Sequence, residues 1–455
     1  RLCQALVSNK NTNLKSISAS GHALPPQSLQ LLGSSITKSN RITTLAIGDR
    51  NMGDDGVMAL CLGLQEEESN DNCSCPLQEL DLCWKNISIG GMNAIGETFA
   101  NSTHLRKLNL SRNETITNDA MNAFVEAAKK MTTVVSSPLF PSLEYLDVSE
   151  CSIGPAGVES LSKCLDIGAT KRKTQLSLVI SSNTIGPEGC RYISLLLCSP
   201  GREDVKLSSS LIASLSLSNC GVGDGGLDQL VSVAKERGGC CDGLKMLDLS
   251  SNGIGSRGAA VIGENLLYDK GCLNSLVELR LSANQLGSDG VVELTRGLGA
   301  DDKGKSDGKK SSALRTLDLS NTNCGAEGAS MALKCTSLSS LRLFNNKLGS
   351  EGFEAITPFL KGGHPSLVNL DLGGNNAKED AVAGLLQALL HKEEDDCSTL
   401  RVLEIGGNEV GEEVESILKE LERVRPELDI ARDKPKVQQE MEQELQSFMQ
   451  ENKSN

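Results

Sequence analysis

The sequence contains very few aromatic residues: Phe, Trp and Tyr together make up 2% of the chain, with a single Trp. A set of ordinary globular domains in a chain of 455 residues would use more aromatic side chains to fill its cores. No apolar run reaches the roughly 18 residues that a membrane-spanning helix requires. The core must therefore be built from Leu, Ile, Val and Ala, and the 45 Gly point to many repeated turns.

The sequence has fewer basic than acidic residues: 45 Lys and Arg against 59 Asp and Glu, which gives a net charge of −14. Proteins that bind nucleic acids or anionic membranes carry basic surfaces. The composition therefore disfavours nucleic acid as a partner and predicts no membrane insertion. A protein partner is the class that remains, and a basic surface on that partner would suit the negative charge.

Residues with catalytic or metal-binding chemistry are also scarce. The four His lie in separate parts of the chain without zinc-ligand spacing, and the Cys73-x-Cys75 and Cys240-Cys241 pairs have no matching second pair. Nucleophile-elbow, phosphate-loop and dinucleotide motifs are missing from the sequence. We therefore predict no catalytic, cofactor-binding or metal-binding residues and no enzymatic activity.

The 16 Cys mostly stand inside helix or strand patterns, such as Cys61 in MALCLGL and Cys164 in LSKCLDI. A disulfide framework is one interpretation of an even count. Buried free thiols in a reducing compartment are the favoured one, because free Cys behaves as a small apolar residue. This favours a cytoplasmic location or another reducing intracellular compartment.

Internal repetition is the dominant signal of the sequence. The clearest copies are LKMLDLSSNGIGSRG from Leu244, LVELRLSANQLGSDG from Leu276 and LSSLRLFNNKLGSEG from Leu338. Aligned on these, about thirteen repeats begin at Leu14, Ile42, Leu77, Leu105, Leu143, Gln175, Ile212, Leu244, Leu276, Leu314, Leu338, Leu367 and Leu400.

Each repeat predicts a strand followed by a helix. The alternating LxxLxL segment suits a short strand, and the next marked position is usually Asn, replaced by Cys151 and Cys220 in two repeats. Buried amides there can satisfy backbone groups where the chain leaves the strand. In the Gly-x-x-Gly that follows, we expect the first Gly at positive φ and the second at a close approach of helix to strand. Ser256, Ser288 and Ser350 are expected to cap the helices that follow them.

The pattern LxxLxLxx(N/C)x(I/L)Gxx(G), followed by a full helix, resembles the ribonuclease-inhibitor-like leucine-rich repeats. The resemblance extends from about Leu14 to Leu421. It implies an α/β solenoid, a horseshoe with parallel strands on the concave face and helices on the convex face. The segment LRVLEIGGNEVGEEVESILKEL at 400–421 is in addition similar to the closing repeats of Ran GTPase-activating proteins. That family's early arginine-bearing loop and long acidic tail are missing from this sequence, so no catalytic residue is carried over.

The residue between the two strand leucines is expected on the concave face, and six of the twelve residues so placed are acidic. Asp and Ser are also ordinary residues in strands of the LDLS type. The candidate partner-binding residues, which include four bulky or basic side chains among the carboxylates, are Asp81, Trp84, Asp147, Asp248, Arg280, Asp318, Arg342, Phe344, Asp371 and Glu404. Trp84 is a plausible anchor for a partner because it is the sole Trp.

Three segments are expected along the chain. Residues 1–13 are predicted to be the end of a truncated repeat or a capping helix, and residues 14–425 the leucine-rich-repeat domain. Residues 426–455 are predicted to be a C-terminal extension helix, with Val437, Met441, Leu445 and Met449 on one stripe. Insertions between repeats, such as 300–313, are expected on one rim.

The predicted function is a non-catalytic protein–protein interaction scaffold within a larger assembly. The alternative is a GTPase-activating protein for a Ran-like small GTPase, which would need a positioned residue to stabilise phosphoryl transfer. A third hypothesis is the sensor half of a receptor whose nucleotide-binding domain precedes Arg1.

Overall fold

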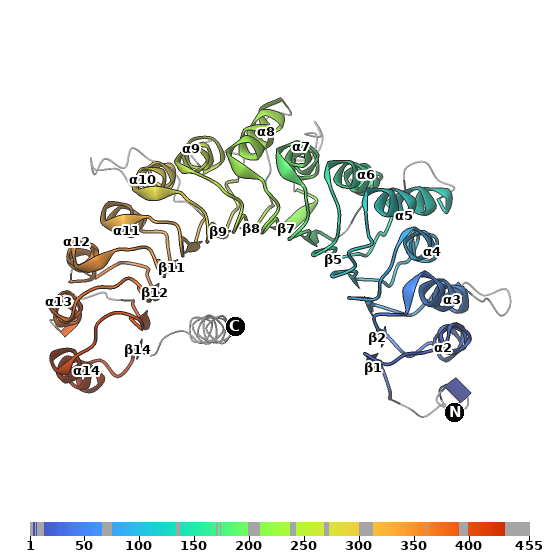
Figure 1. Ribbon diagram of the computed structural model, residues 1–455, viewed down its shortest axis with the longest axis horizontal. Coiled ribbons are helices and arrows are strands. Elements are labelled where there is room, and N and C mark those ends of the chain that lie inside the picture. The colour runs from blue at the N-terminus through green and yellow to red at the C-terminus, as the bar shows by residue number, and fades with distance from the viewer. Residues whose placement is uncertain are drawn as a thin grey trace, which may run out of the picture. The chain divides into compact units, whose positions relative to one another are not determined.

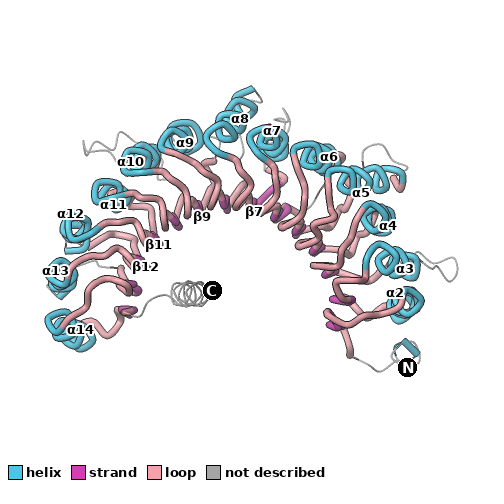
Figure 2. The backbone as a smooth tube through the Cα atoms, in the orientation of Figure 1, coloured by secondary structure: helices cyan, strands magenta, loops and turns pink. Residues whose placement is uncertain are grey.

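The computed structural model describes residues 3, 4, 6, 13–65, 75–132, 137–169, 172, 174–198, 210–236, 243–267, 273–299, 313–361, 363–390 and 399–432. By its contacts the chain divides into two compact units, Arg1–Asp248 and Leu249–Asn455. Strands and helices alternate along both units, with the strands on one side and the helices on the other (Figures 1 and 2). In the described residues, fourteen strands alternate with thirteen α-helices.

The first unit contains eight strands that pair in parallel and in chain order. They are β1 (Ser16–Ser20), β2 (Thr44–Gly48), β3 (Glu79–Asp81), β4 (Lys107–Asn109), β5 (Tyr145–Asp147), β6 (Leu176–Val179), β7 (Ile212–Ser216) and β8 (Met246–Asp248). The helices are α2 (Pro26–Ser39), α3 (Gly53–Gln65), α4 (Ile89–Phe99), α5 (Asn118–Lys130), α6 (Pro155–Asp166), α7 (Gly186–Leu197) and α8 (Gly223–Glu236).

The second unit repeats the arrangement with six strands in chain order. They are β9 (Glu278–Arg280), β10 (Thr316–Asp318), β11 (Ser340–Arg342), β12 (Asn369–Asp371), β13 (Val402–Glu404) and β14 (Asp429–Ala431). The helices are α9 (Ser256–Val261), which continues as the π-helix η2 (Ile262–Leu267), α10 (Gly287–Gly297), α11 (Gly325–Leu333), α12 (Gly349–Lys361), α13 (Glu379–Leu390) and α14 (Glu412–Val424).

The strand leucines form the floor of each repeat's core. In the second unit Leu279, Leu317, Leu341, Leu370 and Leu403 stand in register on successive strands, and each is no more than 1% exposed. The residues on either side of them point to the opposite face of the sheet. The predicted leucine-rich-repeat solenoid, with parallel strands and covering helices, is confirmed.

Buried amides join successive repeats, as the sequence predicts. The Asn346 side chain is completely buried, and its Oδ1 accepts from the backbone N–H groups of Thr322 (3.0 Å) and Cys324 (3.1 Å) in the preceding repeat. Its Nδ2 donates to the carbonyl oxygen of Leu319 at 2.7 Å. Where Cys replaces Asn, the Cys220 thiol donates to the carbonyl oxygen of Ile180 at 3.3 Å. The ladder therefore satisfies backbone groups that leave the strand and would otherwise be buried without partners.

Several helix N-termini are capped by the preceding repeat and not by the serines that the sequence suggested, although Thr117 caps α5 locally through the N–H of Ala120. Ser256 is the first residue of α9, and its N-cap Gly255 has no side-chain bond. The Ser288 hydroxyl has no hydrogen-bond partner, and Ser350 Oγ accepts from the N–H of Lys378 in the next repeat. The prediction of local capping by these serines is wrong.

Side chains at the start of one helix accept from the start of the next. Asn118 Oδ1 accepts from the N–H groups of Gly154 (2.7 Å) and Gly157 (2.9 Å). Glu379 Oε1 does the same for Glu413 (3.0 Å) and Val414 (3.4 Å). Such contacts need neighbouring repeats in place, so they couple the repeats to one another.

We expect Asn118→Ala to lower the free energy of unfolding by about 1 to 2 kcal/mol, because two donors at the start of α6 lose their acceptor. Urea titration followed by circular dichroism measures this change. Asn122→Ala, on the same helix, is the control, because the Asn122 side chain makes only an exposed hydrogen bond with Ser160. We expect its free energy of unfolding to change by no more than about 0.5 kcal/mol. Equal effects of the two variants would contradict capping across repeats.

The two glycines of the Gly-x-x-Gly segment have different roles. Gly287 and Gly349 have φ of 67° and 59°, as expected, whereas Gly255 has an extended backbone with φ of −99°. At the second position, a Cβ on Gly290 would stand 2.7 Å from the Cα of Ser256. At Gly290 the close approach is therefore between neighbouring helices and not, as expected, between helix and strand, whereas a Cβ on Gly352 would meet Leu348 just before its own helix.

Several expectations fall on residues outside the described ranges. They include the helix predicted for Val437 to Met449 and most of the inter-repeat insertions, such as 300–312. Of residues 426–455, the described part runs to Arg432 and contains β14, which pairs in parallel with β13. The sequence analysis did not anticipate this last strand.

Candidate functional site

The sheet face that points away from the helices is the surface that the sequence predicts to be concave, and it is called the strand face here. Figures 1 and 2 show that the helices leave this face uncovered in each unit. The first unit carries the predicted site residues Asp81, Trp84, Asp147 and Asp248. The second unit carries Arg280, Asp318, Arg342, Phe344, Asp371 and Glu404.

Most aspartates on the strand face stabilise the turn that follows their own strand. In each case Oδ1 accepts a hydrogen bond from the backbone N–H two residues later, as the strand ends and the chain turns. The bonds measure 2.9 Å from Cys83 to Asp81, 2.9 Å from Ser149 to Asp147, 2.9 Å from Ser320 to Asp318 and 2.9 Å from Gly373 to Asp371. Asn109 accepts the same bond from Ser111 at 3.1 Å. An Asp at this position is therefore explained by backbone geometry, and its charge alone does not indicate a partner.

Two aspartates of the first unit, Asp147 and Asp248, are also bonded to neighbouring hydroxyls. Asp147 accepts from Ser149 Oγ at 2.6 Å and from Tyr145 Oη at 3.0 Å. Burial and the adjacent Asp147 carboxylate raise the pKa of Tyr145 to about 12. Asp248 Oδ2 accepts from Ser216 Oγ at 3.5 Å. These contacts leave a polar surface whose side chains are held in place.

Trp84 is a large exposed side chain, with 53% of its surface accessible. Its backbone φ of 59° places it on the turn that follows β3, and its N–H donates to the carbonyl oxygen of Ser111. The guanidinium of Arg50 lies 5.5 Å from the ring centroid, within cation–π range. Sequence analysis did not identify Arg50, because the contact joins two repeats.

Lys85, next to Trp84, was also not identified. It fills the position that Asn occupies in most repeats, and this substitution was the signal in the sequence. The side chain is 3% exposed and its Nζ donates to Ser20 Oγ at 2.9 Å. Burial lowers the pKa of Lys85, although the nearby Asp81 acts in the opposite direction. Lys85 therefore replaces an amide of the ladder with a buried cation.

In the second unit, both predicted arginines have carboxylate neighbours. Arg280 Nη2 lies 2.7 Å from Glu278 on the same strand. Arg342 Nη1 lies 3.6 Å from Asp318, whose residue is only 8% exposed. The Asp318 carboxylate thus has partners within the protein, the N–H of Ser320 and the guanidinium of Arg342.

Asp371 and Glu404 are adjacent in the register of β12 and β13, and Arg342 stands on the other side of Asp371. Burial raises the pKa of Asp371 to about 6, and the nearby carboxylates of Glu404 and Asp318 act in the same direction. Within the described ranges neither Asp371 nor Glu404 has a salt bridge. This part of the strand face has more carboxylates than cations.

The pKa of Asp371 predicts a pH effect on stability. The folded state binds more protons than the unfolded state between the ordinary Asp pKa and about 6, so the unfolding free energy falls as pH rises through that window. Asp371→Asn removes this term, and we expect its stability relative to the natural chain to improve by about 2 kcal/mol between pH 4 and pH 7. Urea titrations at both pH values measure the difference. A constant difference would contradict the raised pKa.

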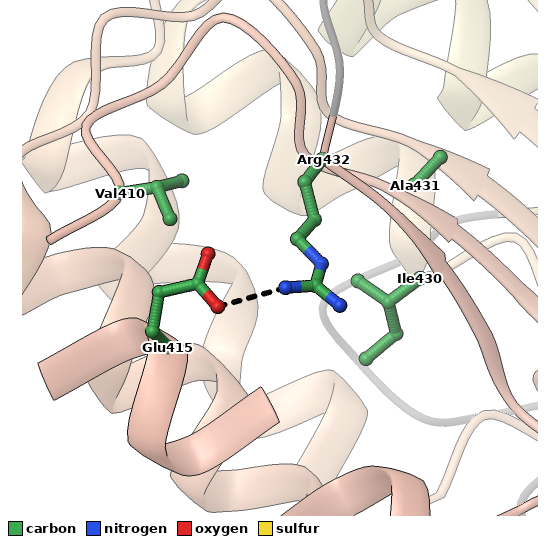
Figure 3. A pocket seen from close by; sticks show the side chains of 5 residues that line it. All are labelled: Val410, Glu415, Ile430, Ala431 and Arg432. Carbon is green, nitrogen blue, oxygen red and sulfur yellow. Dashed lines mark hydrogen bonds and ion pairs between the residues drawn. The ribbon is translucent and has the colours of Figure 1, made fainter. Parts of the chain in front are cut away.

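One hollow lies at the carboxyl end of the described chain (Figure 3). It has a volume of about 570 Å³ and is lined by Val410, Glu415, Ile430, Ala431 and Arg432. Arg432 donates to Glu415 at 2.8 Å and to Glu422 at 2.9 Å. Its cation is therefore engaged by the chain's own carboxylates.

The cysteines do not form a reactive group in the described part of the chain. The eleven described cysteines are free thiols and eight of them are buried. Burial raises the pKa of Cys164 to about 12, which keeps the thiol protonated. In the searched residues, no group of three or more His, Cys, Asp and Glu could hold a metal ion, and no helix is long and apolar enough to cross a membrane.

Comparison with known proteins agrees with the repeats. A family model described as "Leucine Rich repeat" matches residues 101–125, 141–162, 176–194, 244–263, 272–294 and 334–356. The mouse (Mus musculus) NACHT, LRR and PYD domains-containing protein 5 is 29% identical over 197 residues, which are 43% of this chain and 15% of that protein. The human (Homo sapiens) NACHT, LRR and PYD domains-containing protein 14 is 28% identical over 169 residues, 37% of this chain and 14% of that protein.

Among solved structures, the chain is similar to an internalin from Listeria monocytogenes, with a TM-score of 0.43 and 17% identity. The match covers 84% of this chain and 86% of that one. The yeast Rad7 and Elc1 complex matches with a TM-score of 0.31 and 17% identity, over 90% of this chain and 88% of that one. The matched region corresponds to only about one seventh of the length of the curated relatives.

Proposed function

Because this chain is a leucine-rich-repeat protein of the ribonuclease-inhibitor-like class, we propose that it is a non-catalytic scaffold that binds a protein partner within a larger assembly. The observation that carries the proposal is the uncovered strand face, on which polar and charged side chains are held in position by the repeats. Rigid side chains lose little conformational freedom when a partner binds. A binding surface of this kind needs no catalytic residue.

The test is affinity capture from a native extract under reducing conditions, followed by mass spectrometry. Ser177→Arg/Ser340→Arg places a long side chain on the strand face of each unit. Ser160→Arg/Ser232→Arg places the same side chains on helices α6 and α8 and serves as the control. We expect the strand-face variant to lose partners that the control retains. Partners retained by both variants would refute binding through the strand face.

The GTPase-activating alternative leads to a different result in the same experiment. Recovery of a Ran-like small GTPase, followed by faster GTP hydrolysis when the purified chain is added, would replace the scaffold proposal. The relatives described above are named for NACHT, LRR and PYD domains, and their names do not favour this alternative.

A multidomain protein is the second proposal, and the relatives favour it. Their names give two domains besides the repeats, and the matched region is 15% or 14% of their length. In this proposal the chain is the partner-binding part of a protein that also carries other domains. An antibody raised against the repeats, used on native extract, tests it: a band near 48.2 kDa, the mass of this chain, would contradict it.

A reducing intracellular location, with the cytoplasm first, is part of the proposal. It is supported by the eight buried free thiols, because buried free cysteines serve as small apolar side chains. Imaging of the tagged native protein tests the location. Secretion into the medium would contradict it.

A further inference from the structure

On the strand face of the second unit, the type of residue that follows the second strand leucine changes at β11. Earlier repeats of this unit place a serine just beyond the second strand leucine: Ser250, Ser282 and Ser320. The next three repeats place Phe344, Gly373 and Gly406 there. A row of small hydroxyls is thus replaced by one aromatic ring followed by two buried glycines.

The Phe344 ring lies against the backbone of the next repeat. A Cβ on Gly373 would stand 3.1 Å from Phe344 Cδ2 and 3.2 Å from Asp371 Oδ1. A Cβ on Gly374 would stand 3.0 Å from Phe344 Cε2. The glycines therefore leave the space that the ring occupies, and the Asp371 carboxylate lies beside that ring. Phe344 is only half-buried, so part of the ring remains open to a partner.

The charges beside the ring are not balanced. Asp318, Arg342, Asp371 and Glu404 follow one another in the register of β10 to β13. Arg342 lies 3.6 Å from Asp318 and also acts on Asp371, so one cation stands among the three carboxylates Asp318, Asp371 and Glu404. Bringing these carboxylates together costs energy that an added cation would relieve.

We propose that the surface formed by Phe344, Asp371 and Glu404 binds an arginine side chain presented by a protein partner. The proposal rests on the scaffold function and specifies the chemistry of its partner. A guanidinium can lie flat on the exposed ring face while its N–H groups donate to carboxylates. Arginine suits the site better than lysine, because the guanidinium is planar, more weakly hydrated and able to stack.

Proton uptake offers an independent readout. The groups that face Asp371 are Arg342 on β11 and Glu404 on β13, the adjoining strands, and Asp318 on β10, one strand further away. Burial and the two carboxylates raise the pKa of Asp371 to about 6, so it carries a full charge only above that pH. Arginine binding should therefore weaken as the pH falls from 7.4 to 5.

The experiment titrates the full chain into a fluorescein-labelled nona-arginine peptide and follows fluorescence anisotropy at moderate salt. Asp371→Asn/Glu404→Gln is the test variant. Asp81→Asn/Asp147→Asn is the matched control, because it removes two strand-face charges from the first unit and keeps the Oδ1 acceptors. We expect about a 10-fold loss of affinity for the test variant and less than about a 2-fold loss for the control.

Two further arms test the ring and the choice of cation. Phe344→Leu keeps an apolar side chain but removes the aromatic face, and we expect about a 3-fold loss of affinity. The natural chain should bind nona-lysine more weakly than nona-arginine, and its affinity for nona-arginine should fall about 3-fold or more at pH 5. Circular dichroism melts establish that each variant is folded.

Equal losses in the test and control variants would overturn the proposal, because binding would then follow net charge alone. An unchanged affinity in Asp371→Asn/Glu404→Gln would also overturn it. Either result leaves the scaffold function standing if the capture experiment still recovers partners through the strand face. Capture that fails while nona-arginine binds selectively would instead refute the scaffold function in the extract tested.

Discussion

Replacing Leu317 with Asp is expected to unfold the repeats of the second unit around β10. Leu317 is completely buried and stands in register between Leu279 and Leu341. The substitution removes the leucine's contacts and places a carboxylate among the side chains of three repeats. The expected loss exceeds about 5 kcal/mol, which is a large part of the stability of a unit of this size.

Thr316→Asp is the matched control for Leu317→Asp. Thr316 lies one residue earlier on β10, and its side chain points to the strand face, where an added carboxylate stays hydrated. We expect a change below about 1 kcal/mol. Urea titrations followed by far-ultraviolet circular dichroism compare the two variants. A melt of Leu317→Asp that matches the natural chain would contradict the shared core.

The second large effect is expected at Asn346, where the ladder of amides is densest. Asn346→Leu keeps a side chain of similar size. It removes the acceptor of the Thr322 and Cys324 N–H groups and the donor to Leu319 O. The two N–H groups are buried and would be left without a partner, whereas Leu319 O keeps its bond from the Thr322 hydroxyl at 2.7 Å. The expected cost is about 3 to 5 kcal/mol.

Asn345→Gly tests the same turn without touching the ladder. Asn345 is exposed, and its φ of 50° is a conformation that Gly adopts without strain. We expect a change within about 0.5 kcal/mol. Hydrogen exchange adds a local readout, because Asn346→Leu should expose the Thr322 and Cys324 amides. Unchanged protection of these amides would contradict the role of the ladder.

The strands could be placed from the sequence because the physical rule behind them is local. Alternation of leucines places one side of each strand in the core, and the Asn or Cys that follows marks the end of the strand. The same rule identified the residues of the strand face from Asp81 to Glu404. The rule did not predict strand β14, because its sequence DIA lacks the repeated leucines.

Capping could not be inferred from local sequence. Ser256 and Ser350 stand near helix starts, as caps do, but the acceptors of the helix N–H groups come from the previous repeat, at Asn118 and Glu379. Residues about one repeat apart along the chain meet only once the helices stack. Pattern rules for helix ends assume a cap within a few residues and therefore fail here.

The sequence by itself determined the repeat, the direction of each side chain on its strand and the burial of the leucines and ladder amides. These features follow from alternation along a short segment. Only the tertiary structure decided which carboxylates have an arginine partner and which lie beside another carboxylate. Asp318 and Asp371 look alike in LDLS and LDLG, yet Arg342 is bonded to one of them and Glu404 lies beside the other. The physical reason is that charge balance depends on neighbours across strands, and the sequence order does not reveal those distances.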